Sequence, residues 1–408
     1  MKSSLLKRGS RVGVALGLAA GLAVTQATPA QAVLPPGQTA FALGGSDTTD
    51  QVMKAILNGT NQYNIPALPG TTGAQNFVVP GDDNCIQDIT WTSATSSPPA
   101  TQIAPFGSSA GRNKLKAMQT AGAGQTGCMD AARSSAPPRT SLTGDALTFE
   151  YYAFAMDAVA WGSTSLAAPA TMTKAQFKDI YACNITDWSQ LPGGGAGPIQ
   201  RYMAQNGSGT QAFFLADLLD SVAPVASAPG CPAVIQIEEN QAQTVATADY
   251  QSAIFPYSSG VWTFHANNKI NPTIDRRNGA RIAGFTTAGA NANTVAWNGL
   301  DGAYQLNVGT LASTPVNENN IKLNNPTPDY PGIRYVFNVT DTASPSYTVA
   351  NGVLGFTNVP AGAKSPMCSG AKISPILSFG FGPLSSSGNP GGTSNLAGAT
   401  CRKYVPLS

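Results

Sequence analysis

Three short turns rich in glycine and hydroxyl residues are the parts of this chain best suited to bind an anion. They occupy Gly44–Thr49, Gly107–Gly111 and Gly207–Thr210. Each precedes apolar residues at helical spacing, so each is expected to open a helix. The first N–H groups of a helix lack intrahelical partners, and nearby Ser and Thr hydroxyls add donors. One such turn is ordinarily a helix cap, whereas several that converge would hold a tetrahedral oxyanion.

The second turn also fits the Gly-X-Ser-X-Gly pattern around a hydrolase nucleophile. Ser109 would attack the substrate, and His265, the one histidine of the chain, would be the base. A lone histidine beside Trp262 and Phe264 is more often a packed residue. We therefore expect that the protein is not an enzyme, and we keep a secreted serine hydrolase as an alternative.

Composition and charge exclude several other classes of function. The 408 residues carry 23 Lys and Arg against 21 Asp and Glu, without the basic run typical of nucleic-acid binding. A metal site would rest on carboxylates alone, and Asp82-Asp83 lacks the calcium-loop pattern. Neither a Walker A nor a Rossmann glycine pattern is present. We expect no metal, no cofactor and no nucleic-acid partner.

The first 32 residues have the three parts of a secretory signal peptide. Four basic residues precede an apolar run over 12–24, and Ala-Gln-Ala at 30–32 has the small residues of a cleavage site. This run is shorter than the roughly 20 residues that a bilayer requires. We expect cleavage after Ala32, secretion, and no lipid anchor, because the first cysteine is Cys85. Without the four basic residues the mature chain has a net charge of −2.

The six cysteines fit an oxidising compartment, and none lies in the close pairs that zinc sites use. Fifteen pairings are formally open. Proximity in the sequence alone favours Cys85–Cys128, Cys183–Cys231 and Cys368–Cys401. Each disulfide would close a loop of a few tens of residues and contribute on the order of 3–4 kcal/mol.

Strands alternate with helices along the rest of the chain, which is typical of an α/β fold with mainly parallel sheets. Helices are expected to begin near Thr48, Ser108, Thr173 and Ser208, and strands to cover Phe149–Val159, Val234–Glu238 and Ile333–Val339. Two stretches rich in Gly, Pro and Ser are expected to be surface loops, namely Gly193–Gly197 and Gly382–Gly398.

Four segments carry a family resemblance: Leu43–Thr49, Gly107–Gly111, Ala132–Pro137 and Asn206–Thr210. Their order and sequences resemble the phosphate loops of PstS-like proteins, the two-lobed phosphate-binding subunits of bacterial ABC importers. The supporting segments are Phe154–Trp161, which is similar to the family's crossover strand, and Trp188 and Tyr330-Pro331. The resemblance covers residues 40–260, and the region with Cys368 and Cys401 is an elaboration.

The resemblance implies an α/β, two-lobed fold of the type II periplasmic-binding-protein class, with a ligand cleft between the lobes. Residues 1–32 would be the signal peptide, 33–148 the first part of lobe 1, and 149–257 lobe 2. Residues 258–408 would return to lobe 1 and add a disulfide-bearing C-terminal elaboration. Hinge strands are expected near Phe149–Trp161 and Ile254–Tyr257.

The resemblance also implies the residues around the ligand: Thr48, Thr49, Ser108, Ser135, Ser208, Gly209 and Thr210. Two charged groups of the family are missing, because Ala204 replaces its arginine and Ser135 replaces the carboxylate of its third loop. The candidates to replace the arginine are Arg133, Arg139 and Arg201. Asp47 could accept a proton of the ligand. Since a serine hydroxyl tolerates both phosphate and sulfate, selectivity is expected to be looser.

The expected function is extracellular capture of inorganic phosphate or a related oxyanion by a monomeric protein. If a permease exists, the resemblance implies delivery to an ABC importer. The alternative from another class is a secreted interaction or scavenging protein with no transport role. The expected absence of a lipid anchor favours that alternative.

Overall fold

The computed structural model describes residues 43–58, 91–92, 101–102, 107–117, 119, 129–137, 148–266, 276–286, 332–344, 347–355, 365–368, 375–376, 379–384, 393–394 and 401–404. The predicted signal peptide, Arg139 and the predicted Cys85–Cys128 pair lie outside them. The chain from Val33 onward forms one compact unit.

The core of this unit is a mixed sheet whose main strand order is β1-β4-β12-β5-β9-β7-β8. The strands are β1 (Leu43–Gly45), β4 (Ala131–Ser134), β12 (Ile333–Asp341), β5 (Phe149–Ser163), β9 (Ala253–Ser258), β7 (Gln200–Ala204) and β8 (Ile235–Ile237). Parallel pairing joins β1 to β4 at one end and β9, β7 and β8 at the other. The prediction of a mainly parallel sheet is wrong for the middle, because β12 and β5 run antiparallel to their neighbours.

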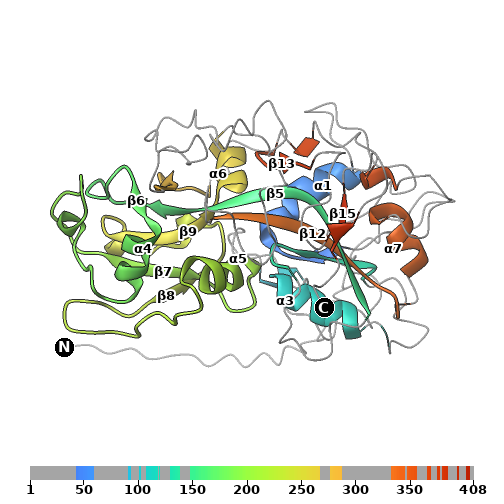
Figure 1. Cartoon of the computed structure of the whole chain (residues 1–408), viewed down its shortest axis with the longest axis horizontal. Helices are drawn as coiled ribbons and strands as arrows, with labels where there is room; N and C mark the ends of the chain where they lie inside the picture. Colours follow the sequence, from blue (N-terminus) through green and yellow to red (C-terminus); the bar gives the residue numbers. More distant parts are fainter. Residues whose placement is uncertain are drawn as a thin grey trace, which may run out of the picture. The chain divides into compact units, whose positions relative to one another are not determined.

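Strand β5 connects the two ends of the sheet. Its residues Phe149–Ala158 pair with β12, and Val159–Ser163 pair with β9. Figure 1 shows β5 and β12 running side by side across the molecule. All residues of β5 except Glu150 are buried, which explains its nearly continuous apolar sequence. We call the elements around β1 and β4 the first lobe and those around β7, β8 and β9 the second lobe. The predicted residue boundaries of the lobes stay predictions.

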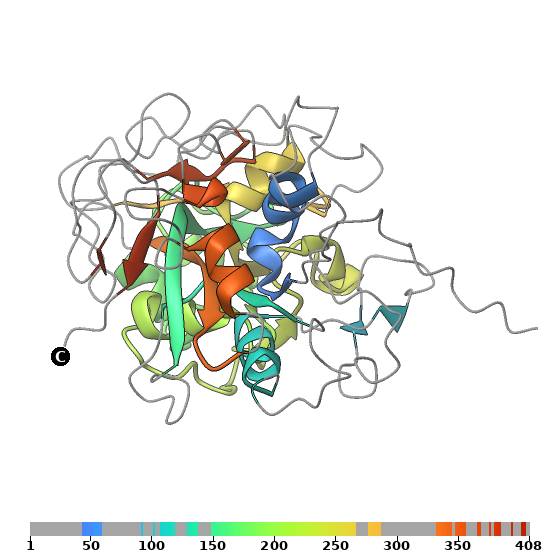
Figure 2. The ribbon, with the colours of Figure 1, turned by 90° about the vertical axis from the view of Figure 1, so that its right-hand side faces the viewer.

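The helices begin at the hydroxyl-rich turns, as the sequence predicts. The turn η1 (Asp47–Thr49) runs into α1 (Asp50–Asn58), and the others are α3 (Ser108–Ala117), α4 (Lys174–Tyr181), α5 (Gly209–Phe213) with the π-turn Phe214–Leu218, α6 (Ser259–Ala266) and α7 (Tyr347–Leu354). Thr173 caps α4 in a capping box with Gln176, and Ser208 accepts from the N–H of Gln211 at 3.1 Å. Figure 2 looks onto the end that carries α1, α3 and α7.

Short elements complete the described part of the chain. The strands are β2 (Trp91–Thr92), β3 (Thr101–Gln102), β6 (Met172–Thr173), β10 (Arg281–Ala283), β11 (Phe285–Thr286), β13 (Gly382–Pro383), β14 (Thr393–Ser394) and β15 (Arg402–Tyr404). The 3-10 turns are η4 (Trp188–Gln190), η6 (Ala242–Thr244), η7 (Thr247–Asp249) and η9 (Pro366–Cys368). Among the described helices, none combines the length and apolar character needed to cross a bilayer.

Two of the predicted disulfides are confirmed. Cys183–Cys231 and Cys368–Cys401 join Cα atoms 5.8 and 4.9 Å apart. The predicted loop Gly193–Gly197 has no helix or strand. The predicted loop Gly382–Gly398 instead begins with β13, which pairs with β5 between the buried residues Phe381 and Leu384. The start of this predicted loop is therefore part of the sheet.

Candidate functional site

The hydroxyl-rich turns of the two lobes converge. The N–H of Gly107 donates to the carbonyl of Gly45 at 3.2 Å, and the N–H of Ser109 donates to the carbonyl of Gly207 at 3.0 Å. A Cβ atom on Gly107 would lie 2.7 Å from that Gly207 carbonyl oxygen. On Gly209 it would lie 2.2 Å from Ser108 Oγ, so only glycine permits this approach.

The predicted hydroxyl residues line this point of contact and are buried. Ser108 accepts from the N–H of Ser135 at 3.0 Å, and Ser46 Oγ lies 2.9 Å from Ser135 Oγ. The Oγ1 atoms of Thr48 and Thr210 are 3.4 Å apart. The hydroxyl of Thr49 is also buried but has no hydrogen-bond partner among the described residues.

The carboxylate of Glu239 occupies the centre of the site. Its Oε1 accepts from the N–H groups of Asp47 at 3.1 Å and Thr48 at 3.2 Å. The hydroxyls of Ser46 and Thr48 each lie 3.2 Å from the same oxygen. Its Oε2 accepts from the hydroxyl of Ser208 and, at 3.2 Å, from the N–H of Thr210. We call these six donors the oxyanion cage.

The loop that follows β8 directs Glu239 into the cage. The N–H of Glu239 donates to Gln205 Oε1 at 2.7 Å. Asn240 adopts a positive φ of 62°, and its Nδ2 donates to Thr48 Oγ1 at 3.2 Å. Asn240 Oδ1 accepts from the N–H of Ser258 at 2.7 Å, which ties the loop to β9. Our sequence prediction missed Glu239. The signal in the sequence is the pair of carboxylates Glu238 and Glu239 directly after a strand. Ligands often bind at the carboxyl ends of parallel strands.

Two further carboxyl groups lie near Glu239. Burial, and then the charge of Glu239, raise the pKa of Asp47 well above its usual value. Asp47 Oδ2 accepts from Gln205 Nε2 at 3.4 Å. Burial and Glu239 also raise the pKa of Glu238 to about 7, and Arg276 opposes this rise. Both carboxyl groups therefore keep a proton more readily than usual beside the charge of Glu239. Within the described residues, no group of three or more His, Cys, Asp or Glu side chains could hold a metal ion.

The structure places the two described candidate arginines outside the cage. Arg133 donates to the carbonyls of Ser46 at 3.1 Å and Leu43 at 3.2 Å, and forms an ion pair with Asp50 at 3.1 Å. It therefore supports the first turn from behind.

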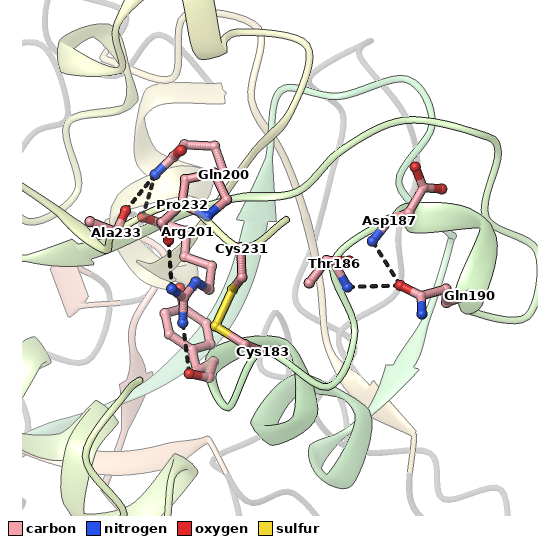
Figure 3. Close-up of a disulfide and its surroundings, with 10 residues drawn as sticks. Cys183, Thr186, Asp187, Gln190, Gln200, Arg201, Cys231, Pro232 and Ala233 are labelled. Atoms are coloured by element: carbon pink, nitrogen blue, oxygen red, sulfur yellow. Dashed lines mark hydrogen bonds between the residues drawn. A yellow bond between two sulfur atoms is a disulfide. The ribbon is translucent and has the colours of Figure 1, made fainter. Parts of the chain in front are cut away.

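Arg201 lies beside the Cys183–Cys231 disulfide, as Figure 3 shows. Its guanidinium donates to the carbonyls of Tyr181 at 2.8 Å and Pro232 at 2.5 Å. It ties together the segments that the disulfide joins, and it contributes nothing to the cage.

Arg334 on β12 is a cation that reaches the cage. It forms a buried ion pair with Asp157 on β5 at 2.8 Å, and its Nη2 donates to Thr48 Oγ1 at 3.2 Å. Its Nη1 is buried and has no hydrogen-bond partner among the described residues. Arg334 was not predicted, because it lies outside residues 40–260, over which the family resemblance is strong.

A small cavity of about 10 Å³ adjoins the cage. It is lined by the cage residues Asp47, Thr48 and Glu239, by apolar side chains, and by the polar side chains of Gln51, Asn240, His265 and Arg276. Ser109, the nucleophile of the hydrolase alternative, accepts from Arg112 Nη2 at 3.2 Å on its own helix. The glycine-serine turn around Ser109 joins the two lobes through the hydrogen bond from the N–H of Ser109 to the carbonyl of Gly207.

A model of the family described as the PBP superfamily domain matches residues 80–358. The chain therefore belongs to the PBP superfamily, and its fold is the α/β, two-lobed fold of periplasmic binding proteins. No curated protein matches the chain.

Several solved structures are similar to this chain over most of its length. The ABC-type phosphate transport receptor from Vibrio cholerae is 16% identical with a TM-score of 0.42, covering 84% of this chain and 98% of that one. A phosphate-binding protein from Stenotrophomonas maltophilia is 16% identical with a TM-score of 0.44, covering 85% and 91%. PstS from Borrelia burgdorferi is 15% identical with a TM-score of 0.35, covering 84% and 98%.

Proposed function

We propose that this protein is an extracellular solute-binding protein whose cleft captures inorganic phosphate or a related oxyanion. The observation that carries the proposal is the oxyanion cage: six N–H and O–H donors from both lobes around one carboxylate. Donors from both lobes favour a closed state when an anion joins them. Binding then requires no chemistry on the ligand.

The residues proposed to surround the anion are those of the cage, with Ser108, Ser135 and Gly209 beside them. Arg334 takes the role of the family's arginine, whose position is Ala204 in this chain. Its buried Nη1 has no hydrogen-bond partner among the described residues, so it can donate to an anion. Asp47 is the proposed acceptor for the proton of a partly protonated ligand, since its buried Oδ1 has no hydrogen-bond partner among the described residues. Thr49 is buried next to the cage and contributes packing.

The disulfides, the predicted signal peptide and the family resemblance also support a location and a partner for the protein. The Cys183–Cys231 and Cys368–Cys401 disulfides fit an oxidising compartment outside the cytoplasm. The predicted signal peptide would direct the chain there without a lipid anchor. We propose that the protein acts as a monomer and delivers its ligand to an ABC permease, as the family resemblance of its sequence implies.

A second function is favoured by one observation. Because Glu239 already joins the lobes, the protein can be closed without a ligand, as an interaction protein would be. The two proposals differ in whether an external anion enters the cage.

Isothermal titration calorimetry with phosphate, sulfate and arsenate tests the proposed capture. The protein is refolded from denaturant first, so that any co-purified anion is removed. We expect phosphate to bind to the wild type or to Glu239→Ala. If neither protein shows heat with any of the three anions, oxyanion capture is wrong and the interaction function is favoured.

A further inference from the structure

We infer that Glu239 is an internal ligand of the oxyanion cage, so that an external oxyanion binds only after this side chain has left. The inference rests on the proposed function, and adds to it a residue that controls occupancy. It makes Glu239 a competitor of the solute.

The hydrogen bonds of Glu239 match those that a captured anion requires. One carboxylate oxygen is bound by the first lobe, through Asp47 and Thr48, and the other by the second lobe, through Ser208 and Thr210. A phosphate oxygen accepts hydrogen bonds from the same N–H and O–H groups. The two ligands would therefore use the same donors.

The burial of Glu239 requires these bonds. Glu239 is only 2% exposed, and an ionised carboxylate without partners at such a position costs several kcal/mol. The loop around it is held in place, since Gln205 binds its N–H and Asn240 is bonded to both Thr48 and Ser258. The side chain is thus built into the site.

Glu239 and an external oxyanion cannot occupy the cage together. The adjoining cavity, about 10 Å³ in volume, has room for about one water. Gly209 already approaches the hydroxyls of Ser108 and Ser135 too closely for even one added carbon atom. Binding is therefore an exchange of one anion for another.

The exchange weakens the apparent affinity for an external oxyanion, because the anion can bind only to the fraction of molecules in which Glu239 has left the cage. If the side chain leaves in one molecule of about a hundred, the apparent Kd for phosphate rises about a hundredfold. Removal of the carboxylate removes this factor.

The test compares three variants by calorimetry with inorganic phosphate. Glu239→Ala removes the internal ligand, and we expect its Kd to be at least tenfold below that of the wild type. Glu238→Ala is the matched control: it removes the neighbouring carboxyl group, at a residue that has no hydrogen bond to the cage donors among the described contacts. We expect less than a threefold change. Glu239→Asp keeps the charge but shortens the side chain by one methylene, and we expect an intermediate gain.

Three outcomes decide between the ideas. If wild type and Glu239→Ala bind phosphate equally, the internal ligand is wrong while oxyanion capture stands. If Glu238→Ala gains as much as Glu239→Ala, repulsion and not occupancy limits binding, which also overturns the inference. If no protein binds phosphate, sulfate or arsenate, the proposed function itself fails. Circular dichroism establishes folding, and if Glu239→Ala does not fold, Glu239→Asp decides by a gain of at least threefold.

Discussion

Two carboxylates are buried near the line where the lobes meet, and they are held in different ways. Asp157 is paired with the guanidinium of Arg334, and its other oxygen accepts from Ser258 Oγ at 2.8 Å. Glu239 is held by neutral donors alone. A carboxylate bonded to a buried cation is part of the framework, because its loss leaves an uncompensated charge. A carboxylate bonded to neutral donors can be exchanged for another oxyanion.

The largest effect is expected at the framework carboxylate. Asp157→Ala leaves Arg334 buried without its ion-pair partner, so the free energy of unfolding should fall by about 3–5 kcal/mol. Urea unfolding measures this loss. Added phosphate should not restore it, and a full restoration would show that Asp157 also occupies an exchangeable site.

Substitution of Glu239 should lower the free energy of unfolding by less, and added anion should restore it. Glu239→Ala leaves the cage donors to water, so the free energy of unfolding should fall by about 1–3 kcal/mol. Phosphate at about a thousand times its Kd would stabilise the variant by about 4 kcal/mol. The midpoint of thermal unfolding with and without phosphate tests this. A variant that is destabilised and shows no response to phosphate would contradict the exchange.

Ser208 should show a smaller effect still. Its hydroxyl donates to Glu239 and accepts from the N–H of Gln211, so Ser208→Ala removes both a cage donor and the cap of α5. We expect a loss of about 0.5–2 kcal/mol. Thr49→Val is the matched control, because it removes a buried hydroxyl that has no partner among the described residues. Equal losses in both variants would mean that the hydroxyl of Ser208 has no special role.

The smallest effect is a dependence of stability on pH. The pKa of Glu238, raised to about 7, and the raised pKa of Asp47 mean that the folded state holds protons that the unfolded state has released. For Glu238 this stabilisation is complete below about pH 4.5 and is lost as the pH rises through about 7, and the raised pKa of Asp47 acts in the same direction. The melting temperature should therefore fall by a few degrees between pH 5 and pH 8.

Glu238→Gln should flatten this dependence. Asp220→Asn is the control, since Lys174 and Lys178 lower the pKa of Asp220 and it titrates below this window. A profile in Glu238→Gln as steep as in the wild type would assign the dependence to other groups.

The parts of the site that the sequence predicted are those with local signals. Thr48, Ser108 and Ser208 stand at helix starts, where a hydroxyl, a glycine and the following apolar residues suffice for a prediction. The strand β5 was equally clear from its apolar run. These features depend on neighbours within a few residues.

The parts that the sequence did not predict depend on distant pairings. Glu239 lies 191 residues from Thr48, and Arg334 lies 286 residues from it. Their positions follow from the parallel pairing of β7 with β8 and the antiparallel pairing of β5 with β12. Neither the register of those pairs nor the direction of β12 has a local signal. Arg133 and Arg201 were candidates because they lie close in sequence to the predicted turns, and both guanidinium groups form their hydrogen bonds outside the cage.

Crystal structures of the refolded wild type, grown without phosphate, and of Glu239→Ala soaked in phosphate would show which group fills the cage. We expect the Glu239 carboxylate between Thr48 and Ser208 in the wild type, and a tetrahedral anion on the same donors in the variant. A wild-type cage that contains only water, with the Glu239 side chain outside it, would mean that Glu239 is not an internal ligand.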